Sequence, residues 1–156
     1  MYYPEEYITS DIMNQTVINA LNKKSTLVQY KLNEHETLRD DGEVITMCKT
    51  YIKERYALEL KRRAHDTLIS DYYKSGSYKY DSYQIPTGYS VEQARNHPVK
   101  FICYDNDMLA ALIFDSNAIN FDKSRYVRLK CEDSIYHYVK MYEVDLAKCK
   151  LIPLEV

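Results

Sequence analysis

A regular apolar pattern in the middle of the chain constrains the fold more than any other feature. Apolar residues recur at every fourth position there, and neither glycine nor proline occurs between Glu43 and Lys74. The residues of this pattern are Val44, Cys48, Ile52, Tyr56, Leu60, Ala64, Leu68 and Tyr72. A spacing of four keeps side chains on one side of an α-helix, with a drift of about 40° at each step. Residues 43–74 are therefore predicted to form one long central helix.

Shorter elements are predicted on either side of this helix. Ser10 is a typical N-cap residue, and the apolar side chains after it predict a helix over residues 11–22. A strand over residues 26–32 follows, with a polar turn after it. Ser90 opens a capping box, which predicts another short helix over residues 91–96.

Beyond Pro98 the pattern changes to short apolar runs that are typical of strands. Residues 99–104 and 108–114 are predicted as two strands joined by a turn, although the second run also suits a helix capped by Asp107. A final strand is expected around residues 149–154. The second half of the chain is therefore expected to supply most of the sheet.

The segments 125–130 and 136–141 form the best-defined pair of predicted strands. If they pair as an antiparallel hairpin, Val127 faces Val139, Leu129 faces His137 and Arg125 faces Met141, which makes one apolar face. The opposite face collects aromatic and basic residues: Tyr126, Arg128, Lys130, Tyr136, Tyr138 and Lys140, with Tyr142 beside them.

These elements together predict a single α+β domain over residues 1–156. The length of 156 residues is usual for one domain with its own core. We expect N-terminal helices and one long central helix, packed against an antiparallel sheet that comes mainly from the C-terminal half.

Composition excludes several classes of protein. The net charge of −2 and the absence of a polybasic segment give no reason to expect attraction to nucleic acid or membrane through bulk charge. The three glycines cannot build a glycine-rich phosphate loop. The acidic start, the lack of a long apolar stretch and four widely spaced cysteines predict a cytoplasmic protein with reduced thiols and no membrane partner.

Tyrosine supplies the leading functional hypothesis. The chain has 17 tyrosines and no tryptophan, and tyrosine provides large contact area while freezing few torsions. The polar loop after the long helix concentrates the candidates for contact with a protein target: Tyr78, Lys79, Tyr80, Tyr83 and Tyr89. The amino-acid composition is also typical of proteins that an AT-rich genome encodes. Together with this loop, it predicts a non-enzymatic accessory or inhibitor protein of a phage, virus or mobile element.

The alternative function is nucleic-acid binding by the aromatic and basic face of the predicted hairpin. Rings and cations that alternate on a sheet can stack bases and hold phosphates. The competing interpretation is that the N-terminal helices cover this face and bury its tyrosines.

Candidate catalytic motifs are fewer. His35-Glu36-Thr37 and His65-Asp66-Thr67 resemble the paired His-x-Thr motifs of the two-histidine phosphoesterases, which lie on strands. On the predicted long helix, His65 and Thr67 would point about 200° apart and could not share a phosphate. A phosphodiesterase therefore remains open only if that helix is wrong.

Metal chemistry finds little support in the sequence. Cys103, Cys131, Cys149 and His137 have suitable ligand atoms for zinc, but no two of them have the close spacing that begins a structural zinc site. Nucleases with a strand-borne Asp followed by Glu-x-Lys need that triplet on a strand, and none falls on a predicted strand after a suitable Asp. We expect no metal and no cofactor.

Overall fold

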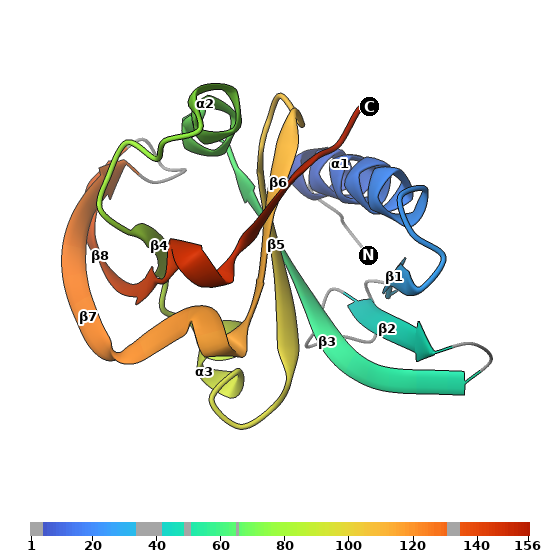
Figure 1. Cartoon of the computed structure of the whole chain (residues 1–156). Coiled ribbons are helices and arrows are strands. Elements are labelled where there is room, and N and C mark those ends of the chain that lie inside the picture. Colours follow the sequence, from blue (N-terminus) through green and yellow to red (C-terminus); the bar gives the residue numbers. More distant parts are fainter. Residues whose placement is uncertain (1–4, 34–41, 49–50, 65, 131–134) are drawn as a thin grey trace.

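The computed structural model describes residues 5–33, 42–48, 51–64, 66–130 and 135–156 (Figure 1). Its central layer is a six-stranded sheet in the order β1-β2-β3-β5-β6-β9. Neighbouring strands in this sheet are antiparallel, except that β3 runs parallel to β5. The strands are β1 (Val28–Leu32), β2 (Gly42–Cys48), β3 (Tyr51–Arg63), β5 (Val99–Asp105), β6 (Ala110–Asp115) and β9 (Lys150–Pro153).

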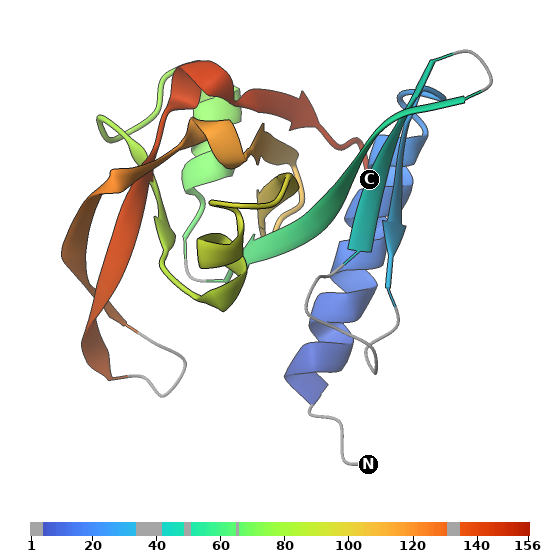
Figure 2. The same ribbon diagram turned by 90° about the horizontal axis from the view of Figure 1, so that it is seen from below.

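Helices and a second sheet cover the two faces of this central layer. The N-terminal helix α1 (Glu5–Asn22) lies on one face. The opposite face carries α2 (Leu68–Ser75), α3 (Tyr89–Gln93) and a three-stranded antiparallel sheet in the order β4-β8-β7 (Figures 1 and 2). The strands of this second sheet are β4 (Tyr83–Pro86), β7 (Ile119–Lys130) and β8 (Tyr136–Val144), and the 3-10 helices are η2 (Ser116–Ala118) and η3 (Leu146–Lys148).

Alternation along β5 divides the interior into two cores. Phe101 and Cys103 lie in the core between the two sheets, whereas Ile102 and Tyr104 lie in the core under α1. Helix α1 contributes its own buried side chains to the second core: Val17, Ile18, Ala20 and Leu21. Because both faces of β5 are covered, the strand is apolar at nearly every position, as is usual for the centre of such a sheet.

The predicted long helix over residues 43–74 is wrong. That segment forms most of β2, all of β3 and all of α2 except its last residue, and the fold is a sheet-dominated α+β fold. A spacing of four is an even number, so residues four apart also lie on one face of a strand. The pattern was therefore compatible with both structures, and the absence of glycine and proline did not discriminate between them. Pairing of β3 with β5 buries Leu58 and Leu60 on the α1 side of the sheet.

The other predicted elements agree better with the structure. The helix predicted over 11–22 lies inside the longer α1, and the helix predicted over 91–96 overlaps α3. The strand predicted over 108–114 overlaps β6, so the alternative of a helix capped by Asp107 is wrong. Within the described chain, no helix is long and apolar enough to cross a membrane.

The register predicted for the C-terminal hairpin is confirmed. Strands β7 and β8 pair with Val127 opposite Val139, Leu129 opposite His137 and Arg125 opposite Met141. The final strand, β9, joins the central sheet beside β6 rather than extending this hairpin.

Candidate functional site

The aromatic and basic face of the β7–β8 hairpin is exposed. Tyr126, Tyr136 and Tyr138 have 69%, 56% and 74% of their surface accessible, and Arg128 and Lys140 are also exposed. Tyr126 lies opposite Lys140, and Arg128 lies opposite Tyr138, so rings and cations alternate across the two strands. We call these five residues the tyrosine face. It lies on the opposite side of the molecule from α1, so burial of this face under the N-terminal helix is excluded (Figure 1).

One cation of this face is held by an aromatic ring. The guanidinium carbon of Arg128 lies 4.5 Å from the centre of the Tyr136 ring, within the range of a cation–π contact. Lys130 faces Tyr136 in the register, and its side chain lies outside the described structure. The tyrosine face thus combines flat apolar surface with positive charge.

Tyr142 was predicted beside this face but is buried in the core between the sheets. Its ring packs edge-on against Phe121 with centroids 5.3 Å apart. Its hydroxyl donates to Glu92 and accepts from Arg95 at 2.9 Å. These hydrogen bonds, from Tyr142 first and then Arg95, lower the pKa of Glu92. Strand β4 and helix α3 cover only the end of β8 that carries Tyr142. The face of β8 to which Tyr142 belongs is therefore buried at this end and exposed at the other.

The tyrosine loop predicted to bind a protein divides into buried and exposed residues. Tyr83 is only 1% exposed and belongs to β4, while the half-buried Tyr78 packs edge-on against Tyr72 and Tyr83. Burial raises the pKa of Tyr78 to about 12. Tyr80 is 54% exposed, with the Lys79 ammonium 5.4 Å from the centre of its ring. Tyr89 begins α3, and its side chain lies outside the described structure.

A groove lies between the end of β3, β4 and the inner face of the hairpin. It consists of two cavities of about 480 and 370 Å³. They share five lining residues and are therefore continuous: Arg63, Asp66, Gln84, Leu129 and Met141. We call this the arginine groove. Residue spacing alone does not predict it, because its walls come from segments far apart in the chain.

Arg63 is held rigidly in the wall of the arginine groove. Its Nε and Nη2 atoms donate to the two carboxylate oxygens of Asp66 at 2.9 and 2.6 Å, and Nη1 donates to the Tyr83 hydroxyl at 3.5 Å. Burial opposes the charge of Arg63, but the hydrogen bonds to Asp66 and Tyr83 raise its pKa above the ordinary value. Arg63 therefore stays charged in a fixed orientation.

The N-terminus of α2 is anchored beside this wall by a buried carboxylate. Asp105 is fully buried, and its Oδ2 accepts from the backbone N–H of Ser70 at 2.8 Å. In the described part of the chain, its Oδ1 has no hydrogen-bond partner. Burial raises the pKa of Asp105. Thr67 precedes this helix without making a side-chain cap, so Asp105 supplies the acceptor from a distant strand.

The structure places a Glu-x-Lys triplet on a strand, contrary to one part of the reasoning against a nuclease. Such nucleases also need a strand-borne Asp before the triplet, and the described residues that precede it hold none. Glu59-Leu60-Lys61 lies on β3, where residues two apart share a face. The side chain of Glu59 is 8% exposed, and Lys61 lines the arginine groove. Among the described residues, the pairing of β2 with β3 ends with Gly42 opposite Leu58, just before this triplet. The alternation of apolar residues at positions 58 and 60 with charged residues at 59 and 61 was the signal for this strand.

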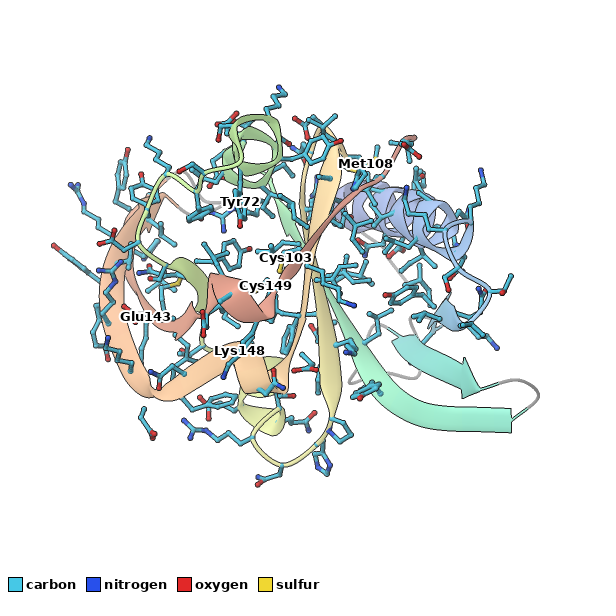
Figure 3. All side chains as sticks on the ribbon, viewed as in Figure 1. Tyr72, Cys103, Met108, Glu143, Lys148 and Cys149 are labelled. Carbon is cyan, nitrogen blue, oxygen red and sulfur yellow. The ribbon has the colours of Figure 1, made fainter. Side chains whose placement is uncertain are left out.

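The predicted zinc set does not come together among the residues that are described. Cys103 is buried between the sheets and Cys149 lies beside it (Figure 3), whereas His137 is exposed on the hairpin. Burial raises the pKa of both thiols, that of Cys149 to about 12. Cys131 falls outside the described residues. A search of the described chain finds no group of three His, Cys, Asp or Glu residues able to hold a metal ion.

The structure describes only part of the two His-x-Thr motifs: Asp66 and Thr67 lie between β3 and α2, not on a strand. His35 and His65 lie outside the described residues, so this prediction stays untested. Neither a protein-family model nor a curated protein matches this chain. Function is therefore inferred from the tyrosine face, the arginine groove and the Glu59-x-Lys61 triplet.

Proposed function

We propose that this protein binds single-stranded nucleic acid through the tyrosine face. The observation that carries the proposal is the exposure of Tyr126, Tyr136 and Tyr138 among cations on one face of the hairpin. Unpaired bases stack on such rings whatever their sequence, while Arg128 and Lys140 hold the phosphates between them. Duplex bases are already stacked on each other, so single strands are the favoured ligand.

The chemistry of this face fits nucleic acid better than an apolar protein surface. Val127 and Leu129 of β7 are partly buried and line the arginine groove instead, whereas Ile135, next to Tyr136, is 59% exposed. The five residues of the tyrosine face itself are all aromatic or basic, so its surface differs from the apolar centre of a protein interface. Its rings alternate with cations, which is the pattern of a stacking surface along a charged backbone.

Binding is expected to weaken with salt to a limited extent, because few cations take part. Two phosphate contacts on a single strand, from Arg128 and Lys140, predict a loss of affinity of about sevenfold between about 50 and 200 mM salt. Fluorescence anisotropy with labelled single-stranded DNA and RNA of ten nucleotides measures this loss. A duplex of the same sequence serves as the control. No binding of any single strand at the lower salt concentration would exclude the proposal.

Cleavage of the bound strand is a second candidate function, favoured by Glu59 and Lys61 on one face of β3 beside the groove. The described residues provide no complete metal site, so no catalytic step is assigned to a metal. The test is incubation of labelled strands with the protein and Mg²⁺. Glu59→Gln is expected to abolish cleavage while leaving strand binding without metal unchanged. Intact strands after incubation with the unmodified protein would exclude this function.

Capture of a protein target by the tyrosine loop stays a prediction. Support for it now comes from Tyr80 and Lys79, because Tyr83 is buried and Tyr78 is half-buried. A phage, viral or mobile-element origin likewise remains a proposal from composition. Affinity purification from the native host separates the two kinds of partner, since nuclease treatment releases only those held through nucleic acid.

A further inference from the structure

The arginine groove has the size and the mixed lining of a small-molecule site. Its two cavities, of about 480 and 370 Å³, fall within the range of about 300–1,000 Å³ that is usual for such sites. It is distinct from the tyrosine face, although Arg128 borders both.

Positive charge dominates the polar part of the groove. Lys61, Arg63 and Arg125 line it, whereas Asp66 is the one carboxylate residue among its described lining. Arg128 borders the groove, but its guanidinium lies over Tyr136 on the tyrosine face. Asp66 already accepts two hydrogen bonds from Arg63. Arg62 also borders the groove, but its guanidinium donates to Asn106 at 3.0 Å. The lining therefore retains an excess of cations, which favours an anionic ligand.

The guanidinium groups of the groove are oriented before any ligand arrives. Asp66 and Tyr83 fix Arg63, and the ring of Tyr83 lies 5.5 Å below its guanidinium carbon. With the amide oxygen of Gln84 turned toward it, Arg125 donates to Gln84 across the strands. Such positioning reduces the entropy that binding would otherwise cost. Asp66 and Gln84 already occupy the Nε and Nη2 edges of Arg63 and Arg125, so phosphate oxygens would accept from the remaining Nη hydrogens.

Apolar and aromatic side chains form the rest of the groove. Val127, Leu129 and Met141 come from the inner face of the hairpin, and Tyr78 and Tyr80 come from the loop before β4. The rings of Tyr78 and Tyr80 meet edge to face, with centroids 6.3 Å apart. A flat ring can lie between such a tyrosine and the aliphatic side chains opposite.

We propose that the arginine groove binds a nucleoside monophosphate unit, either as a free nucleotide or as the phosphorylated end of a strand. The base lies in the smaller cavity against Tyr80 and Leu129. The phosphate lies toward Arg63 and Lys61 in the larger cavity, and Arg125 borders the sugar and phosphate. Inorganic phosphate alone would leave the apolar wall unused, and a nucleoside alone would leave the cations unused.

Isothermal titration with adenosine 5′-monophosphate, adenosine and inorganic phosphate tests the site. The nucleotide is expected to bind at least about tenfold more tightly than either fragment. Arg125→Gln is expected to weaken nucleotide binding by about tenfold or more, since it removes a hydrogen bond to a charged group. Tyr80→Ala is expected to weaken it by about fivefold or more through lost stacking. The matched control is Lys150→Gln, which removes an exposed charge on β9, outside the groove.

Each outcome decides the proposal. Equal binding of nucleotide and phosphate, unchanged binding in both groove variants, or no nucleotide binding would overturn it. Thermal unfolding of each variant confirms that the fold is retained. Competition by a 5′-phosphorylated strand, but not by its 5′-hydroxyl form, assigns the ligand to a strand end; absence of competition assigns it to a free nucleotide. Replacing Tyr126 and Tyr138 leaves nucleotide titration unchanged, so failure of the tyrosine-face proposal is distinguishable from failure of this one.

Discussion

Replacement of Phe101 by alanine is expected to lower the free energy of unfolding by about 3–5 kcal/mol. Phe101 is fully buried on β5, a strand with a partner on each side. Its ring stacks on that of Phe114 with centroids 5.2 Å apart and an interplanar angle of 14°. Alanine would leave a cavity between the two sheets, where the paired strands prevent the backbone from closing around it.

Urea denaturation followed by circular dichroism measures this loss. The matched aromatic control is Tyr138→Ala, which removes an exposed ring and is expected to change the free energy of unfolding by less than about 0.5 kcal/mol. If Phe101→Ala cost no more than this control, the core between the sheets would be assigned incorrectly. The control also establishes that Tyr138 can be replaced without loss of the fold.

The double replacement of Tyr126 and Tyr138 by alanine is expected to weaken single-strand binding by at least about 30-fold. Each base stacked on an aromatic side chain contributes about 1–3 kcal/mol, and every 1.4 kcal/mol is a tenfold change in affinity. The two residues lie on different strands of the hairpin and remain exposed in the folded protein. Fluorescence anisotropy at the lower salt concentration measures the change.

Two controls identify the ring as the source of this effect. Phenylalanine at both positions keeps the aromatic faces and is expected to bind within about threefold of the unmodified protein, because stacking does not use the hydroxyl. Tyr73→Ala removes an exposed tyrosine from α2, away from the hairpin, and should leave affinity unchanged. Full affinity in the alanine double variant would refute binding through the tyrosine face.

The hairpin could be predicted from the sequence because its signals are local. Alternation with a period of two determines which residues share a face, and neighbouring strands joined by a short turn determine the register. The pairs from Val127–Val139 to Arg125–Met141 follow directly from these two constraints. The helix predicted over residues 43–74 was wrong for the converse reason. The spacing in this segment suits both a helix and a strand, and the distant partner β5 decides between them.

The candidate sites depend more on tertiary contacts than the hairpin does. Tyr126 and Tyr142 occupy the same predicted face, but β4 and α3 bury only Tyr142. Tyr83 was predicted to lie in a loop, but pairing of β4 with β8 places it in the core. In the arginine groove, Arg63 and Arg125 come from different sheets, and no local pattern brings them together. The Glu59-x-Lys61 triplet, which the helix prediction concealed, could have been found from the sequence by testing the strand alternative.

The parallel pairing of β3 with β5 also determines the order in which the molecule can fold. The chain passes through α2, β4 and α3 before β5 can return to β3, so this contact closes a long loop at high entropic cost. The β7–β8 hairpin closes a short one. We expect the hairpin to form early and the strand pairs that close long loops, β3–β5, β4–β8 and β6–β9, to form late.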